Sequence, residues 1–134
     1  MSIKNIAEIV IAVNDAQKAV EFFNDILGLN FNIEWTMPNE KMSVKAAQIG
    51  NTQLQVVEST NNEGVIAKFV ERHGEGLHHI ALNVENLDQL ISKLKEKGIK
   101  LIPEQPIVYF NGRYIFIHPK SAFGVLIELI EYNK

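Results

Sequence analysis

The chain has 134 residues, a length that predicts one domain over residues 1–134, and its net charge of −3 gives no electrostatic case for binding nucleic acid. It contains no cysteine, which excludes disulfides and thiolate metal sites, and no apolar run is long enough to cross a membrane. Residues 1–5 lack the features of a signal peptide. We therefore expect a cytoplasmic protein with no membrane or nucleic-acid partner.

The first half predicts a β-α-β-β-β module over about residues 3–59. A strand over residues 3–13 leads into a helix that Asp15 caps and Gly28 ends. The apolar positions of this helix have the spacing of one buried face, and they are Ala16, Ala19, Val20, Phe23, Ile26 and Leu27. Three strands are expected after it, over residues 31–35, 43–49 and 52–58.

A connecting helix is expected over about residues 63–74, and a second module over about residues 76–132 repeats the first. Its helix has Asn86 as cap and Gly98 at its end, and its apolar positions follow those of the first helix at an offset of 71 residues. Its strands are expected over residues 77–84, 99–102, 113–118 and 125–130, with a loop containing Pro103 and Pro106 after the second. The duplication predicts an α+β fold in which paired modules form an eight-stranded open barrel around a cleft.

Four polar residues lie in the middle of otherwise apolar strands, at symmetry-related positions. Glu8 corresponds to His79 at the offset of 71 residues, and Gln55 corresponds to Glu128 at an offset of 73. A buried carboxylate needs a proton or a cation, and this mostly oxygen donor set suits Co²⁺, Mn²⁺, Ni²⁺, Zn²⁺ or Mg²⁺. Taken singly, His79 would be read as a core histidine and Glu8 as an edge residue. Together the four residues favour one divalent metal ion.

Several segments resemble methylmalonyl-CoA epimerases, a branch of the vicinal oxygen chelate superfamily that also includes glyoxalase I. The segments around His79 (residues 76–81) and Glu128 (residues 118–121 and 124–129) carry the epimerase likeness, and residues 25–29 are typical of the wider superfamily. The resemblance covers the whole chain. It implies the paired-module fold, a homodimer, an acyl-CoA substrate and a metal held by residues 8, 55, 79 and 128. Gln55, His79 and Glu128 match that pattern, but Glu8 stands where the family has histidine.

The resemblance implies an isomerase that interconverts the (R) and (S) forms of methylmalonyl-CoA through an enolate that a divalent metal stabilises. Glu128 would serve as ligand and as acid/base residue, and Glu40 as a second catalytic residue, although the spacing fits a solvated turn carboxylate equally well. Arg113 could contact an anionic substrate group. Lys120 and Ser121 could do so too, but a structural turn is favoured for them.

Two other functions remain open from the residues. Two Glu, one Gln and one His are also the ligands of some glyoxalase I enzymes, so a lactoylglutathione lyase is the first alternative. A member of the superfamily that binds a ligand without catalysis is the second, since Glu8 adds a negative charge that should weaken a metal as a Lewis acid.

Overall fold

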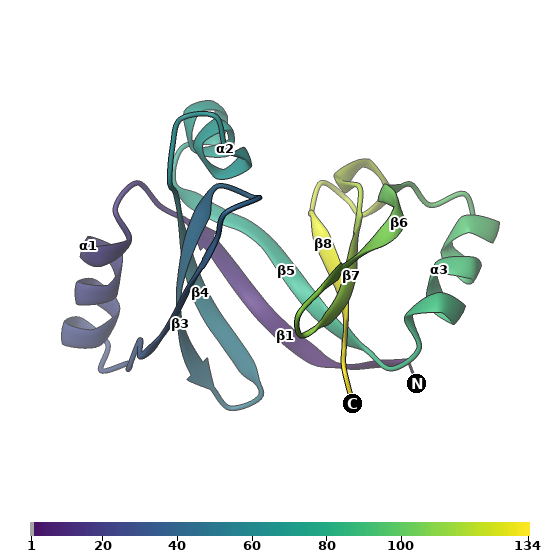
Figure 1. Cartoon of the computed structure of the whole chain (residues 1–134), viewed down its shortest axis with the longest axis horizontal. Coiled ribbons are helices and arrows are strands. Elements are labelled where there is room, and N and C mark those ends of the chain that lie inside the picture. Colours follow the sequence, from purple (N-terminus) through teal and green to yellow (C-terminus); the bar gives the residue numbers. More distant parts are fainter. Residues whose placement is uncertain (1) are drawn as a thin grey trace. The chain divides into compact units, whose positions relative to one another are not determined.

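The computed structural model describes residues 2–134, and within them the β-α-β-β-β order occurs twice, as the sequence predicts (Figure 1). The first module has β1 (Ile3–Ala12), α1 (Ala16–Glu21), a π-helical turn η1 (Phe22–Ile26), β2 (Ile33–Met37), β3 (Met42–Ile49) and β4 (Thr52–Ser59). The connecting helix is α2 (Val65–His73). The second module has β5 (Gly76–Val84), α3 (Leu87–Glu96), β6 (Leu101–Tyr109), β7 (Gly112–Ile117), a 3₁₀ turn η2 (Pro119–Ser121) and β8 (Ile127–Tyr132).

The strands are hydrogen-bonded in the order β2-β3-β4-β1-β5-β8-β7-β6. Within each module the hairpin strands pair antiparallel, whereas β5 pairs parallel with β8. The chain forms two compact units: an N-terminal unit of residues 9–78, and a C-terminal unit that combines residues 2–8 with residues 79–134. Strands β1 and β5 therefore each contribute to both units. None of the helices in residues 2–134 has the length and apolar character that a membrane crossing requires.

In the N-terminal unit, α1 begins where the sequence predicts, because the side chain of Asp15 accepts a hydrogen bond of 3.2 Å from the backbone N–H of Lys18. Val20 and Ala16 pack on Val13 and Val56. The expectation that Ile26 and Leu27 are buried is wrong, since their side chains are 70% and 56% exposed. The helix widens into the π-helical turn at Phe22, and this shifts the following side chains away from the face that a regular α-helix would bury.

In the C-terminal unit, Asn86 caps α3 as predicted, accepting a hydrogen bond of 3.2 Å from the N–H of Gln89. The helix packs through Leu87 and Ile91 on Leu129 and Ile115 of the sheet. Two strands, β6 and β8, continue beyond the ends that the sequence predicts. β6 continues through the segment that was expected to be a loop, and β8 continues to Tyr132.

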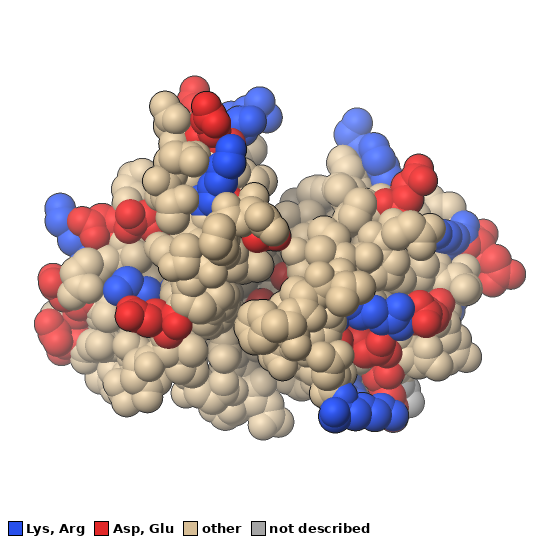
Figure 2. Space-filling model, viewed as in Figure 1, with Lys and Arg blue, Asp and Glu red and all other residues tan. Residues whose placement is uncertain are grey.

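The two prolines are compatible with β6 because this strand lies at the edge of the sheet, where a missing backbone N–H need not break a ladder. Its pairing with β7 is interrupted between Ile102 and Ile107, the stretch that contains both prolines. On the face seen in Figure 2, Lys and Arg side chains are interspersed with Asp and Glu. This mixture is expected for a chain whose net charge is −3.

Candidate metal centre

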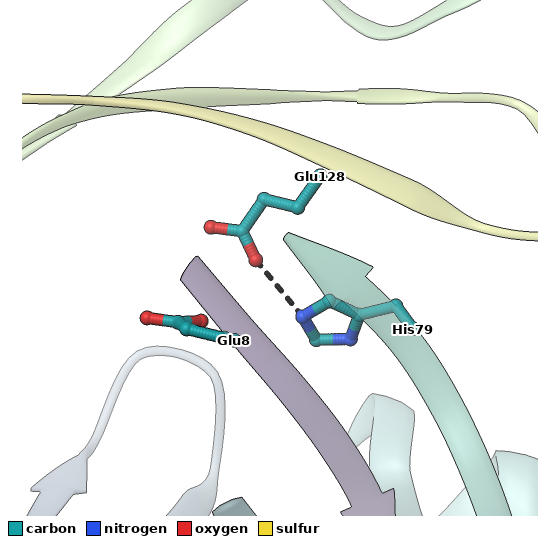
Figure 3. Close-up of side chains that lie close together, drawn as sticks. All are labelled: Glu8, His79 and Glu128. Carbon is teal, nitrogen blue, oxygen red and sulfur yellow. Dashed lines mark hydrogen bonds and ion pairs between the residues drawn. The ribbon is translucent and has the colours of Figure 1, made fainter. Parts of the chain in front are cut away.

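Three of the four predicted ligands lie together in the C-terminal unit (Figure 3). Glu8 comes from β1, His79 from β5 and Glu128 from β8, and one donor atom from each lies within 4.8 Å of the others. His79 Nε2 is hydrogen-bonded to Glu128 Oε1 at 2.9 Å. Residues separated by as much as 120 positions in the sequence therefore converge on one point, and we call Glu8, His79 and Glu128 the carboxylate–histidine triad.

The order of the strands explains this convergence, because β1, β5 and β8 follow one another in the sheet. In the parallel pair of β5 and β8, Glu128 lies opposite Ala81, two residues from His79 and on the same face of β5. In this unit a hydrogen bond of 2.7 Å runs from the N–H of Glu85, which follows β5, to the carbonyl oxygen of Ser2, which precedes β1. Each member of the triad therefore lies on a different strand, and the three strands are neighbours in the sheet.

Two aromatic side chains of β7 lie beside the triad. Phe116 of β7 lies opposite Glu128, and its ring meets the His79 ring edge-on with centroids 5.4 Å apart. Tyr114 packs against Phe116 from the same strand, with centroids 5.8 Å apart. The side chains of His79 and Glu128 are only 11% and 9% exposed. The charged groups therefore interact in a medium that screens them weakly.

Burial perturbs both members of the hydrogen-bonded pair. It raises the pKa of Glu128, because the carboxylate loses its hydration. Burial lowers the pKa of His79, and the negative charge of Glu8 opposes this change only in part. His79 is therefore a neutral imidazole at pH 7 with a lone pair to offer, and Glu128 is a carboxyl group whose ionised form would gain from a nearby cation.

This donor chemistry fits a divalent metal ion. A neutral imidazole and two carboxylates supply one nitrogen and several oxygen donors, which Mn²⁺, Co²⁺, Ni²⁺ and Zn²⁺ accept. A cation would also offset the cost of placing Glu8 and Glu128 together in an apolar setting. Glu8, the departure from the epimerase pattern, thus points its carboxylate toward the other two members of the triad rather than away from them (Figure 3).

The remaining predicted site residues belong to the N-terminal unit. Gln55 is buried in β4, and its side-chain Nε2 donates a hydrogen bond of 2.9 Å to Gln53 Oε1. Glu40 lies in the turn between β2 and β3 and is half-buried. The roles of Gln55 as a metal ligand and of Glu40 as an acid/base residue stay predictions.

The residues considered for an anionic substrate group have structural contacts. Arg113 binds Asp88 and Glu131, each at 2.9 Å. Ser121 Oγ accepts a hydrogen bond of 3.0 Å from the N–H of Lys100. These contacts place Arg113 beside the start of α3 and make Ser121 part of a turn.

One neighbour of the triad was missed from the sequence. Burial and the charges of Glu8 and Glu128 raise the pKa of Tyr132, and the strand that carries it was expected to end at residue 130. The alternation of side chains along β8 places Tyr132 on the same face as Glu128, so a correct end of the strand would have identified it.

Comparisons with known proteins show which families and solved structures the chain is similar to. Residues 8–117 match the family described as the glyoxalase/bleomycin resistance protein/dioxygenase superfamily. The chain is 33% identical over 123 residues to human mitochondrial methylmalonyl-CoA epimerase, covering 90% of this chain and 70% of the human protein. The epimerase from Mycobacterium tuberculosis has a similar crystal structure, with a TM-score of 0.90 and 30% identity, covering 98% of this chain and 90% of that one. An epimerase solved with methylmalonyl-CoA and NH₄⁺ gives a TM-score of 0.89 and 28% identity over 98% and 96% of the two chains.

The superfamily's other activities are also represented. A probable lactoylglutathione lyase from Synechocystis is 30% identical over 123 residues, covering 91% of this chain and 91% of the relative. The matches confirm the predicted resemblance to methylmalonyl-CoA epimerases and the predicted fold of paired β-α-β-β-β modules. This chain belongs to the glyoxalase/bleomycin resistance protein/dioxygenase superfamily.

Proposed function

We propose that this protein is a methylmalonyl-CoA epimerase, an isomerase that interconverts the (R) and (S) forms of its acyl-CoA substrate. The observation that carries the proposal is the carboxylate–histidine triad, in a chain whose similarity to epimerase structures extends over nearly its full length. The substrate follows from epimerase relatives and from the epimerase solved with methylmalonyl-CoA.

We assign Glu8, Gln55, His79 and Glu128 as ligands of one divalent ion, chosen from Co²⁺, Mn²⁺, Ni²⁺, Zn²⁺ and Mg²⁺. When bound, such an ion supplies a Lewis acid that favours negative charge on a carbonyl oxygen. Because Gln55 belongs to the N-terminal unit and the triad to the C-terminal unit, this assignment requires the two units to act as a single domain.

The residues of the chain account for the proton transfer. The hydrogen to be removed lies on the carbon between the thioester and the carboxylate of the substrate. An oxygen of ionised Glu128 takes this proton, and the C–H bonding electrons pass to the thioester carbonyl to give a planar enolate. Burial raises the pKa of metal-free Glu128, and a bound cation would favour its ionised form, which is the form that accepts the proton. The surrounding Phe116 and Tyr114 limit the access of water.

Inversion requires a second group that returns a proton to the opposite face of the enolate. We assign this role to Glu40, a half-buried carboxyl group in the turn between β2 and β3. In the reverse direction Glu40 removes the proton and Glu128 returns one. In either direction the substrate loses one proton and gains one, so its number of protons does not change. Homodimerisation and a cytoplasmic location complete the proposal; gel filtration tests the first and localisation of a tagged chain tests the second.

Exchange of the substrate hydrogen in heavy water tests the function directly. Purified protein, loaded in turn with each of the five ions, is incubated with methylmalonyl-CoA, and deuterium at the exchanged carbon is followed by mass spectrometry. We expect rapid incorporation with at least one ion, and conversion of a single starting epimer into a mixture of the (R) and (S) forms. Succinyl-CoA, which lacks the stereocentre, is the matched control. Exchange no faster than without protein for every ion would contradict the proposal.

A lactoylglutathione lyase is the second candidate, favoured by the oxygen-rich donor set and by the Synechocystis relative. The same protein preparations are tested with methylglyoxal and glutathione, and formation of the thioester product is followed by its absorbance. Activity here without exchange of methylmalonyl-CoA would assign the lyase. A chain that stays free of metal in excess Co²⁺ or Mn²⁺ and turns over neither substrate would instead favour a ligand-binding member.

A further inference from the structure

The turn that carries Glu40 contains an unusual backbone conformation. Residues 38–41 join β2 to β3, and the N–H of Lys41 donates a hydrogen bond of 3.2 Å to the carbonyl oxygen of Pro38. Lys41 has a φ of 56°, in the left-handed region that residues with a side chain seldom adopt. Such a conformation persists only where surrounding contacts hold it. The residue that follows Glu40 is therefore fixed from outside the turn.

The contacts that hold Lys41 come from the segment at the end of β4. Its carbonyl oxygen accepts a hydrogen bond of 2.8 Å from the N–H of Thr60. The Ser59 hydroxyl lies 3.3 Å from the same oxygen and also contacts the carbonyl oxygen of Asn61. The Lys41 ammonium group forms an ion pair of 3.4 Å with Glu63, but this pair is exposed and contributes little. The backbone of Lys41, more than its side chain, is thus the point of attachment.

A glycine leaves room for this attachment. Gly64, the residue before α2, has a φ of −70°, so its backbone would suit any residue. The need for glycine is one of space, because a Cβ there would lie 2.8 Å from Ser59 Oγ and 3.1 Å from the carbonyl oxygen of Lys41. The Asn61 side-chain oxygen accepts hydrogen bonds of 2.8 and 3.1 Å from the N–H groups of Glu63 and Gly64. Gly64 is therefore held against Lys41, and no side chain fits between them unless one of them moves.

The placement of Glu40 depends on this backbone. Its side chain is half-buried, and within residues 2–134 no hydrogen bond or ion pair holds its carboxyl group. With no polar partner, the carboxyl group takes its position from the backbone and the packing of the turn. A shift of about 1 Å in a reacting group can cost about 100-fold in rate. A small movement of the turn would therefore matter if Glu40 transfers a proton.

We propose that Lys41 and Gly64 are positioning residues, which hold the turn of residues 38–41 so that Glu40 can return a proton to the enolate. The inference deepens the proposed function and rests on it, since it requires Glu128 and Glu40 to act on opposite faces. Lys41 contributes its left-handed backbone and its carbonyl oxygen. Gly64 contributes the space in which that oxygen is bound.

The two epimers of the substrate distinguish a misplaced Glu40 from a general loss of activity. In heavy water Glu128 removes the proton from one epimer, exchanges it for a deuteron of the solvent, and can return that deuteron to the same face. The product is deuterated substrate of unchanged configuration, and Glu40 is not needed. From the other epimer Glu40 must remove the proton, so exchange and inversion both need it.

A misplaced Glu40 therefore abolishes inversion and leaves exchange from one epimer only, a result that we call selective loss. Partial unfolding instead lowers exchange and inversion equally from both epimers. Each purified epimer is incubated in heavy water with the metal-loaded protein. Deuterium content is followed by mass spectrometry, and configuration by an enzyme that consumes one epimer only.

Two substitutions at position 41 provide a matched pair. Lys41→Val should lower inversion by roughly 10- to 100-fold with selective loss, because a β-branched residue disfavours the left-handed conformation and the turn must shift. Lys41→Asn should leave inversion within about threefold of the parent, because asparagine adopts that conformation more readily. Both variants lose the ion pair with Glu63, so this loss cannot explain a difference between them.

A second pair tests the contact from the side of α2. Gly64→Ala should also give selective loss, but only by roughly 3- to 10-fold, because the Lys41 carbonyl oxygen need move by less than 1 Å. Gly28→Ala is its control in the same unit: no atom lies within 4 Å of the added methyl group, and a φ of 73° makes alanine destabilising there. Gly28→Ala should lower the melting temperature and leave the ratio of inversion to exchange unchanged.

Glu40→Gln separates the inference from the function on which it rests, and we expect selective loss in this variant too. If Glu40→Gln shows it and Lys41→Val inverts both epimers as the parent does, the role of Glu40 stands and the positioning inference is wrong. Equal losses of exchange and inversion from both epimers in Lys41→Val and Gly64→Ala would also overturn the inference. A Glu40→Gln variant that inverts normally would overturn the role of Glu40 together with the inference. A parent protein that exchanges neither epimer would overturn the proposed function as well.

Discussion

In both modules a glutamate at the end of a strand accepts a hydrogen bond from the first residue of the helix. At the equivalent buried position of that strand, however, the two modules have different residue types. At the end of β4, Glu58 accepts a hydrogen bond of 2.7 Å from the N–H of Ala16, the first residue of α1. At the end of β8, Glu131 accepts one of 3.0 Å from the N–H of Leu87, the first residue of α3. In both modules a carboxylate thus lies at the positive end of a helix.

The inner positions three residues earlier differ. Gln55 and Glu128 are both buried, at 4% and 7% exposure, but Gln55 is a neutral amide that hydrogen-bonds to Gln53 on its own strand. Glu128 is a carboxyl group that meets His79 and Glu8 instead. Shared residues therefore build the same architecture twice, and an exchange of amide for carboxylate gives the two inner positions different partners.

The largest effect on turnover should come from replacing Glu128. Glu128→Ala removes a ligand and the proposed base, and we expect turnover of methylmalonyl-CoA to fall by about 10²- to 10⁴-fold, measured by hydrogen exchange into the substrate. Gln55→Ala should cost less, because it removes only a neutral ligand. A larger loss of turnover in Gln55→Ala than in Glu128→Ala would contradict the roles proposed for the two residues.

Metal binding should stabilise the parent protein and not the variants that lack a triad side chain. An ion at 100 times its Kd raises the free energy of unfolding by about 2.7 kcal/mol. We expect this gain for Co²⁺ in urea denaturation of the parent, and none in His79→Ala. Hydrogen exchange locates the effect: protection by Co²⁺ should be strongest in β5 and β8. Protection confined to residues 9–78 would contradict the proposed triad.

Restoring histidine at position 8 should change which metal the site prefers. Glu8→His replaces an oxygen donor by a nitrogen donor and removes one negative charge. We expect the ratio of Ni²⁺ affinity to Mn²⁺ affinity to rise by roughly tenfold, because imidazole suits the later transition metals and carboxylate suits Mn²⁺. Competition titrations with a chromogenic chelator measure this ratio. An unchanged ratio would indicate that Glu8 is not a ligand.

The smallest effects should come from the helix anchors. Glu58→Gln and Glu131→Gln each weaken a charge-assisted bond to a helix N-terminus, and we expect each to lower the free energy of unfolding by about 1 kcal/mol. Glu131→Gln should cost slightly more, because Glu131 also binds Arg113. Urea denaturation of the metal-free variants measures both. The two losses of unfolding free energy should differ by no more than one partly exposed ion pair contributes. A much larger difference would show that the two anchors are not equivalent.

The features predicted correctly from the sequence depend on local spacing. Asp15 and Asn86 lie immediately before apolar helical patterns, and both cap their helices. Glu8, His79 and Glu128 each interrupt an apolar strand, Glu8 and His79 at corresponding positions, and one donor atom from each lies within 4.8 Å of the others. The duplication supplied long-range information here, since equivalent positions in two similar modules have equivalent surroundings.

The features that were missed depend on contacts between distant segments. The π-helical turn at Phe22 leaves no mark in the apolar spacing of the helix, so Ile26 and Leu27 were expected to be buried. Pro103 and Pro106 predict a loop, and only the edge position of β6 makes them compatible with a strand. Burial and the charge of Glu8 both raise the pKa of Tyr132, which lies 124 residues after Glu8 in the sequence, and no local pattern encodes this proximity.

The position of β1 in the structure has a consequence for biosynthesis. Residues 2–8 belong with residues 79–134, so the ribosome produces the first part of the C-terminal unit long before the rest of that unit. Glu8 is synthesised before His79, and His79 before Glu128, so the three residues can meet only after Glu128 has left the ribosome. The closure of such long loops also slows the assembly of non-local sheets. A nascent chain shorter than 128 residues therefore has an incomplete triad, and capture of the ion should be among the last events of folding.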